Sequence, residues 1–383
     1  MKILKESLIA FGALATLMSL IWYAYNTGQP LREDGSLSTA GWGALCRQSL
    51  WVMDGVVLCW FISRFDYRNL FALATPLLLL SWFLMLIVLG DYLLSGSFRF
   101  GMCLRCITRS FQPARWALLI TVVSLSAYTA LGCPSAFWGG RLSRGSRSHP
   151  LLSDWILAGI LFVSLLLVTL TGGFRFSLLL FMTVLVMTVT GGRRRTAGLF
   201  TALSSIAILL YVLGDSSRLA RVLEAFSCDA NAIRAVPLPQ TMLLNGGWLG
   251  IGIGNSTYRD WLPHREIPEF LSVSIGEEFG WINLVAMLVC IILLLSTALA
   301  IGIKTKNRFG RRLAFGIAAL LGFQTLFHIS AMMGWASPFL ACVPLPFASE
   351  TGFNACPPLI GLGLLFSIAN HPEPDDSADS PVR

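Results

Sequence analysis

Long apolar stretches, separated by short polar connectors, recur along the whole chain. Each stretch approaches the roughly 17–25 residues that a helix needs to cross a bilayer. We therefore predict an all-α fold, a polytopic membrane helix bundle of about ten transmembrane helices. Their expected bounds are 7–25, 46–63, 70–90, 114–132, 152–171, 174–190, 197–213, 279–302, 313–334 and 357–370.

The composition indicates that lipid is the solvent for most of the surface. Of the 383 residues, 55% are hydrophobic and 13% are charged, whereas a soluble domain has about 25% charged residues. We expect one transmembrane domain over residues 1–370. The last residues, 371–383, are acidic and rich in proline and serine, and we expect a disordered cytoplasmic tail there.

The basic residues lie at the ends of the apolar stretches, where they act as topology signals. If the N-terminus is cytoplasmic, the cytoplasmic connectors collect Lys2, Lys5, Arg64, Arg68, Arg141, Arg144, Arg147, residues 193–195, Lys304, Lys306, Arg308, Arg311 and Arg312. This positive-inside arrangement predicts a multi-pass protein of the cytoplasmic membrane with both termini inside. The net charge of +8 suits anionic membrane lipids. We expect no nucleic-acid partner, because no basic face is visible.

The longest connector, residues 214–272, is external in this topology and joins the seventh and eighth helices. Connections this long are usually functional. Its glycine-rich stretch, residues 245–256, superficially resembles a dinucleotide-binding loop, but no strand precedes it and no βαβ unit follows it. A flexible re-entrant or interfacial segment is the plainer interpretation.

Charged side chains gather where this loop meets the eighth helix. The cluster contains His264, Arg265, Glu266, Glu269, Glu277 and Glu278. Carboxylates near a membrane boundary are costly unless they are paired or functional. One interpretation is structural, with the carboxylates paired to Arg259, Arg265 or Arg221 to fix the loop. The other interpretation is a reaction site.

The order of the motifs in this loop is informative. A glycine-rich run over residues 246–256 is followed by Leu262-Pro263, and then by Gly-Glu-Glu-Phe-Gly over residues 276–280. Together they resemble the loop of the FtsW/RodA/SpoVE (SEDS) family, which has a similar glycine run, Leu-Pro and Gly-Glu-Glu-Leu-Gly.

Three further stretches resemble the same family and occur in the family order. Residues 90–113, with Arg99 and Gln112, resemble its Asn-Gly-x-x-Arg-Trp and Gln-Pro-Ser-Glu region. Arg218 and Arg221 fall where the family has paired arginines. Gln324 and residues 344–349 resemble its ninth-span Gln and its Pro-Leu-Pro-Phe-x-Ser segment.

The resemblance implies a peptidoglycan glycosyltransferase that polymerises lipid II outside the membrane, for cell division or cell-shape maintenance. In that reaction a sugar hydroxyl attacks an anomeric carbon and lipid pyrophosphate leaves. A carboxylate must take the hydroxyl proton, and positive charge must stabilise the pyrophosphate. Arginine suits the second role, and a divalent cation (Mg²⁺ or Mn²⁺) could share it. The implied partner is a class B penicillin-binding protein.

The resemblance also assigns residues to roles. Glu269 falls where the family has its essential loop Asp and is our candidate for the catalytic base, with Glu277 or Glu278 orienting the loop. The candidate substrate-binding residues are Arg99, Gln112, Arg218, Arg221, Arg259, Glu277 and Glu278. Within the spans, we expect Gln324 to hydrogen-bond between helices. For His328, a hydrogen-bonded helix residue and a functional group are equally open.

Several residues depart from the family pattern. Arg115 replaces a Glu, Leu118 replaces a Lys, and Gly172-Gly173 replaces a Pro-Asp pair. These changes keep two alternatives open: a lipid II flippase or transporter, and a non-catalytic scaffold for a penicillin-binding protein. The spans contain few charged residues that could line a transport path, which favours the enzyme over the flippase.

Overall fold

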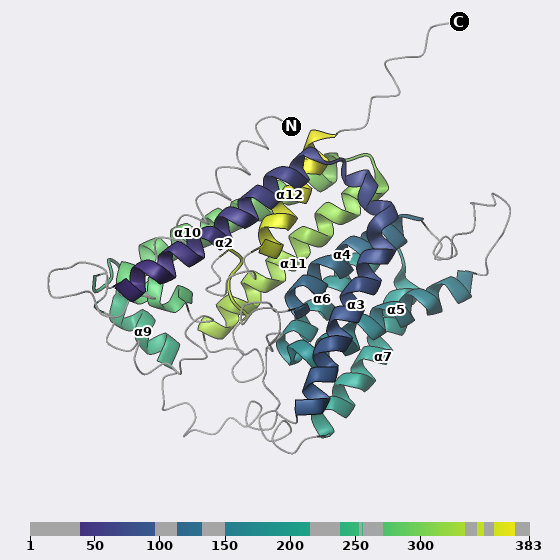
Figure 1. Ribbon diagram of the computed structural model, residues 1–383, viewed down its shortest axis with the longest axis horizontal. Helices are drawn as coiled ribbons and strands as arrows, with labels where there is room; N and C mark the ends of the chain where they lie inside the picture. The colour runs from purple at the N-terminus through teal and green to yellow at the C-terminus, as the bar shows by residue number, and fades with distance from the viewer. Residues whose placement is uncertain are drawn as a thin grey trace, which may run out of the picture.

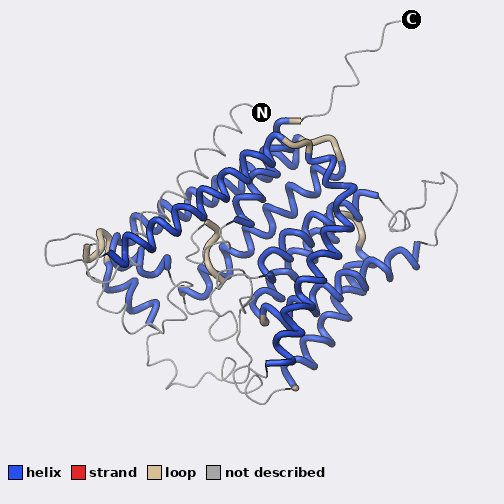
Figure 2. The backbone as a smooth tube through the Cα atoms, in the orientation of Figure 1, coloured by secondary structure: helices blue, strands red, loops and turns tan. Residues whose placement is uncertain are grey.

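The computed structural model describes residues 39–95, 113–131, 150–214, 238–252, 255, 271–333, 343–347 and 356–371. Within these ranges the regular secondary structure is entirely helical (Figures 1 and 2). The predicted all-α helix bundle is therefore confirmed. The expected first span, 7–25, and the tail beyond residue 371 lie outside the described residues.

The helices follow the apolar stretches closely. In chain order they are α2 (Thr39–Arg64), the short 3-10 helix η1 (Tyr67–Asn69), α3 (Leu70–Ser95), α4 (Pro113–Leu131), α5 (Pro150–Gly172), α6 (Phe174–Thr190), α7 (Arg194–Leu213), α9 (Leu238–Gly246), α10 (Leu271–Lys304), α11 (Arg308–Met332) and α12 (Cys356–Asn370). The bounds of α6 match the prediction. Helices α2, α10 and α11 begin earlier than predicted, and α9 lies inside the predicted loop.

Among the described helices, four are long and apolar enough to cross a membrane by length and composition alone. They are Tyr67–Gly90, Asp154–Thr171, Ile275–Lys304 and Arg308–Met332. Helices α6 and α12 are apolar but shorter. The bundle also carries large apolar side chains on its outside, such as Trp60, Phe83 and Ile292. An apolar exterior around an apolar core is the arrangement expected in lipid.

The core lies where α4 and α11 cross the middle of the bundle. Helix α4 packs against α3, α5, α6 and α11, and its Val122 is fully buried. Leu180 of α6 and Leu313 of α11 are also fully buried in this core. Helix α12 lies between α2 and α11 and is buried along almost all of its length (Figure 1).

The basic connectors meet at one end of the bundle. The rings of Tyr67 and Phe309 stack with centroids 6.0 Å apart, which joins the α2–α3 connector to the start of α11. Arg312 donates a hydrogen bond to the Gly191 carbonyl at 3.3 Å, which joins α11 to the α6–α7 turn. At the same turn, Arg193 forms an ion pair with Asp154 at 3.1 Å. These contacts agree with connectors that lie on one side of a membrane.

Helices α2 and α12 approach each other through glycines. A Cβ atom on Gly363 would lie 2.8 Å from the carbonyl oxygen of Cys59. A Cβ atom on Gly55 would lie 2.5 Å from a side-chain methyl carbon of Leu359. Small residues allow such close helix packing, which in lipid replaces the missing hydrophobic driving force.

This close approach gives a test of the fold. We expect Gly363→Ala to destabilise the protein by about 1–3 kcal/mol, because the new methyl group overpacks the α2–α12 interface. The effect is measured as a lower midpoint of thermal unfolding in detergent. Gly198→Ala in α7 is the matched control, since its Cβ would meet nothing within 4 Å. Equal midpoints for the two variants would contradict the contact.

Candidate functional site

Helix α10 is broken near the end that lies away from the basic connectors, which we call the outer end of the bundle. Gly280 has φ 81° and ψ 172°, which is not a helical conformation, and it separates a short first segment from the long helix that follows. A break of this kind leaves backbone carbonyls before it and N–H groups after it without partners in the helix. These groups must be satisfied elsewhere, because unpaired backbone groups are costly in or near lipid.

The glycine-rich loop after α9 supplies the partners. Two loop N–H groups donate to carbonyls before the break, and two loop carbonyls accept from N–H groups after it. The bonds are Ile251 N to Glu277 O (3.0 Å), Gly252 N to Glu278 O (3.1 Å), Trp281 N to Gly247 O (3.0 Å) and Ile282 N to Trp248 O (3.4 Å). We call this pairing of residues 246–252 with residues 276–282 the clasp.

The clasp requires glycine at three positions because the two backbones nearly touch. A Cβ on Gly246 would lie 2.3 Å from the Gly276 carbonyl oxygen, and one on Gly250 would lie 2.1 Å from that of Glu278. Gly250 and Gly280 also have φ of 81°, where other residues are strained. The described part of the glycine-rich stretch therefore makes a close backbone contact with α10.

The clasp buries two carboxylates. Glu277 and Glu278 have relative exposures of 0% and 1%. Glu277 Oε1 accepts a hydrogen bond from Asn245 Nδ2 at 2.9 Å, and Asn245 lies in the last turn of α9. The indole of Trp281 donates to the Leu243 carbonyl at 2.9 Å, which ties α9 to the long part of α10. The clasp thus joins α9, the glycine loop and α10 into one unit.

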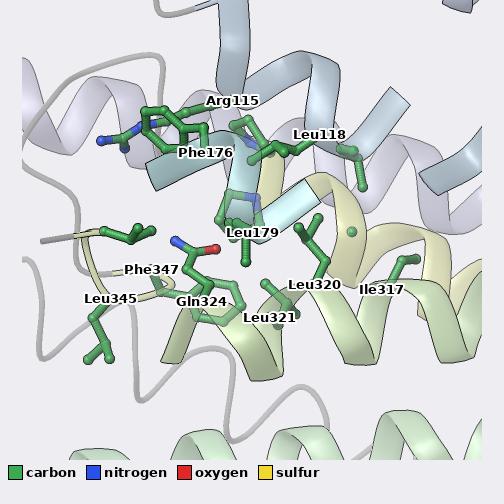
Figure 3. Close-up of a pocket in the computed structure, with 15 residues that line it drawn as sticks. Arg115, Leu118, Phe176, Leu179, Ile317, Leu320, Leu321, Gln324, Leu345 and Phe347 are labelled. Atoms are coloured by element: carbon green, nitrogen blue, oxygen red, sulfur yellow. The ribbon is translucent and has the colours of Figure 1, made fainter. Parts of the chain in front are cut away.

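A small cavity lies between the outer ends of α4, α6, α11 and α12 (Figure 3). Its volume is about 40 Å³. Its floor is apolar, with leucines such as Leu118 and Leu179, while Arg115 and Gln324 supply polar groups. The cavity is therefore amphipathic.

Two arginines flank one ring beside this cavity. The guanidinium carbon of Arg115 lies 5.6 Å from the ring centroid of Phe176, and that of Arg175 lies 5.1 Å from it. Both arginines stand in the first turn of their helices, α4 and α6, where the helix dipole is also positive. The outer end of this helix pair therefore attracts anions.

Helix α11, the ninth predicted span, holds the irregular segment 343–347 beside the cavity. Gln324 donates from Nε2 to the Pro344 carbonyl at 2.7 Å. His328 is buried, and its Nδ1 lies 2.8 Å from the Val343 carbonyl oxygen. His328 is thus a hydrogen-bonded helix residue. The predicted helix-to-helix bond of Gln324 was wrong, because its acceptor lies in residues 343–347, which are not helical.

Most of the predicted site residues lie outside the described ranges. They are Arg99, Gln112, Arg218, Arg221, Arg259 and Glu269. Of the predicted set, the structure describes Glu277 and Glu278. The described residues contain no group of three His, Cys, Asp or Glu side chains that would hold a metal ion. They do not supply a ligand set for a divalent cation, so we derive no step through one.

Sequence reasoning did not single out Arg175 or Phe176. The available signal was an arginine inside an apolar stretch, directly after the Gly172-Gly173 turn. Arg115 was identified only as a departure from a motif. That Arg115 and Arg175 face the same ring depends on the packing of α4 against α6, which no local pattern reveals.

Comparison with known proteins gives a consistent result. The FtsW/RodA/SpoVE family model, described as cell cycle protein, matches residues 6–373. A "Probable peptidoglycan glycosyltransferase FtsW" from Geobacter sp. (strain M18) is 25% identical over 336 residues, covering 86% of this chain and 87% of the relative. One of the same name from Enterococcus hirae is 33% identical over 129 residues, covering 33% of this chain and 32% of the relative.

Solved structures share the fold. The rod shape determining protein RodA of Thermus thermophilus superposes with a TM-score of 0.62 at 19% identity, covering 96% of this chain and 97% of that chain. A chain from a peptidoglycan synthase complex, studied for the coordination of polymerization and crosslinking, gives a TM-score of 0.66 at 21% identity. The match covers 95% of this chain and 96% of that chain.

The clasp predicts a specific pattern of amide protection. We expect Gly250→Ala to expose the amides of Ile251, Gly252 and Trp281 to hydrogen exchange, because its methyl group would collide with the Glu278 carbonyl. Gly247→Asn is the matched control. Gly247 has φ 54° and open space around its Cβ, and asparagine tolerates that conformation. Unchanged protection in Gly250→Ala, measured by mass spectrometry, would rule out the clasp.

Proposed function

The chain belongs to the FtsW/RodA/SpoVE family of cell cycle proteins, and from this premise we propose that it is a peptidoglycan glycosyltransferase. It polymerises lipid II into glycan strands at the outer face of the cytoplasmic membrane. The observation that carries this proposal is the family match over residues 6–373. The full-length similarity to a relative named as a peptidoglycan glycosyltransferase supports it.

The chemistry requires a base and a stabilised leaving group. A sugar hydroxyl oxygen forms a bond to the anomeric carbon of a second lipid-linked sugar, while the bond from that carbon to pyrophosphate breaks. The hydroxyl proton passes to a carboxylate, and the electron pair leaves on the lipid pyrophosphate. We assign the base to Glu269, which lies two residues before the start of α10.

The clasp supports this role by fixing the chain next to Glu269. The first segment of α10 begins at Leu271 and ends at the break, where loop residues hold the carbonyls of Glu277 and Glu278. A base is effective only when its carboxylate stays within hydrogen-bond reach of the hydroxyl, and a misplacement of about 1 Å can cost about a hundredfold in rate. In this proposal Glu277 and Glu278 orient the loop.

The amphipathic cavity supports binding of a lipid pyrophosphate. Arg115 and Arg175 place positive charge at the outer ends of α4 and α6, beside an apolar floor suited to an isoprenoid chain. Arg99, Gln112, Arg218, Arg221 and Arg259 are the further substrate-binding residues of the proposal. The cavity of about 40 Å³ is far smaller than the about 300–1,000 Å³ of typical ligand sites. Substrate entry therefore requires the outer segments to separate.

The proposed location and partner follow from the same premise. We place the basic connectors in the cytoplasm, which puts both termini there. Residues 1–370 form the transmembrane domain and residues 371–383 a cytoplasmic tail. The proposed partner is a class B penicillin-binding protein, which crosslinks the strands. The structural similarity to a chain of a peptidoglycan synthase complex supports a partner of this kind.

One observation favours a second candidate function, a non-catalytic scaffold. Arg115 and Leu118 replace the family's Glu and Lys, so a charge pair at the outer end of α4 is lost. The described residues give less support to a flippase. Among them, the buried carboxylates are Glu277 and Glu278, both at the outer end of α10, so they do not form a charged path through the bundle.

The decisive substitution is Glu269→Gln. We expect it to lower the rate of glycan formation from fluorescent lipid II by about 10²- to 10⁴-fold, because the base is lost while the side-chain size is kept. The assay uses the full chain with its cognate penicillin-binding protein, whose transpeptidase is blocked. Glu266→Gln, a nearby loop carboxylate, is the control and should retain activity.

Other outcomes have distinct meanings. Strands that form at the normal rate in Glu269→Gln would show that another loop carboxylate is the base. A wild-type complex that binds lipid II without forming strands would overturn the enzyme and support the scaffold.

A further inference from the structure

Helix α2 contains the predicted span 46–63, and an acidic side chain, Asp54, lies about halfway along that span. Asp54 is exposed and lies ten residues before Arg64, which ends the helix at the basic end of the bundle. At 1.5 Å per residue this is about 15 Å, or half of the roughly 30 Å hydrocarbon layer. Between Leu50 and Ser63, Asp54 is the sole Asp, Glu, Lys or Arg.

The surroundings of Asp54 form a continuous exposed face. On the opposite side of α2, Gly55 and Cys59 pack against α12. The exposed side of α2 consists of Leu50, Met53, Asp54, Val57, Trp60 and Phe61, whose apolar members are each more than half exposed. We call these six residues the α2 outer face.

A carboxyl group on such a face is costly in lipid. Ionisable residues within membrane spans usually pair with another group. Among the described residues no hydrogen bond or ion pair to Asp54 is formed. The charge of Asp54 reaches the buried thiol of Cys356 in α12, which cannot neutralise a carboxylate. The guanidinium of Arg64 lies over the Trp60 ring, 5.2 Å from its centroid. If lipid were the only contact of this position, an apolar side chain such as leucine would be more stable there than a carboxyl group. The position of Asp54 therefore indicates a partner within the membrane.

We propose that the α2 outer face docks a membrane-spanning helix of another protein that carries a Lys or Arg halfway through its span. The cation pairs with Asp54 in the low-dielectric interior, where such a pair is strong. Trp60 and Phe61 pack against the aliphatic stem, and an aromatic face also attracts a cation.

Two other occupants fit the chemistry less well. The predicted first span, residues 7–25, contains no Lys, Arg or His that could neutralise Asp54. A second copy of the chain, related by a two-fold axis, would bring two Asp54 carboxyl groups together, which is unfavourable when both are ionised. Charge complementarity therefore favours a foreign basic helix.

The test measures energy transfer in lipid vesicles between the full chain and synthetic leucine-rich membrane helices. The chain carries a donor dye at its C-terminus, and each helix carries an acceptor dye and either Arg, Leu or Glu at its centre. We expect the Arg helix to bind about three- to thirtyfold more tightly than the Leu helix, the range of interhelical polar contacts in membranes.

Variants of Asp54 separate charge pairing from general adhesion. Asp54→Asn should reduce binding of the Arg helix to the level of the Leu helix, and Asp54→Glu should restore it. Asp54→Lys should reverse the preference and favour the Glu helix. Equal binding of the Arg and Leu helices to the wild type would overturn the proposal. A second result would also overturn it: energy transfer between copies of the wild-type chain that is lost in Asp54→Asn. That result would identify a second copy as the occupant.

Discussion

Backbone pairing across the break in α10 holds the outer end of this protein together. The break leaves backbone N–H and C=O groups without partners inside the helix, and such groups are costly to leave unpaired in or near lipid. The glycine loop satisfies four of these groups in a reciprocal manner, and it can do so only because Gly246, Gly250 and Gly280 let the two backbones touch. The same contact buries Glu277 and Glu278 and fixes the start of α10.

The clasp and the amphipathic cavity complement each other. The clasp belongs to α9 and α10, whereas the cavity lies between α4, α6, α11 and α12. In the proposed reaction the loop next to the clasp supplies the base. The cavity and its arginines supply positive charge and an apolar surface for the lipid. In this proposal the clasp holds the base in place while the outer segments around the cavity separate to admit a bulky substrate.

Hydrophobic patterning predicted the helices well, because lipid requires a long apolar stretch wherever a helix crosses. It placed α6 at the observed bounds, but it missed the first segment of α10, where serine and glutamate make the stretch look like loop. The break at Gly280 and its pairing with Gly247 and Trp248 were also missed. This contact uses backbone atoms of residues that are distant in sequence, so no side-chain pattern reports it. For the loop, the sequence motifs indicated function through resemblance, whereas the structure explains why the glycines are needed.

The central claim is that the clasp positions the loop for polymerisation. The most direct measurement is the initial rate of lipid II polymerisation by Gly280→Ala, in protein shown by size-exclusion chromatography to be folded. A Cβ at Gly280 would lie 2.3 Å from the Trp248 carbonyl oxygen, so the account predicts a folded protein with little activity and with lipid II binding retained. Activity equal to that of the wild type would contradict it.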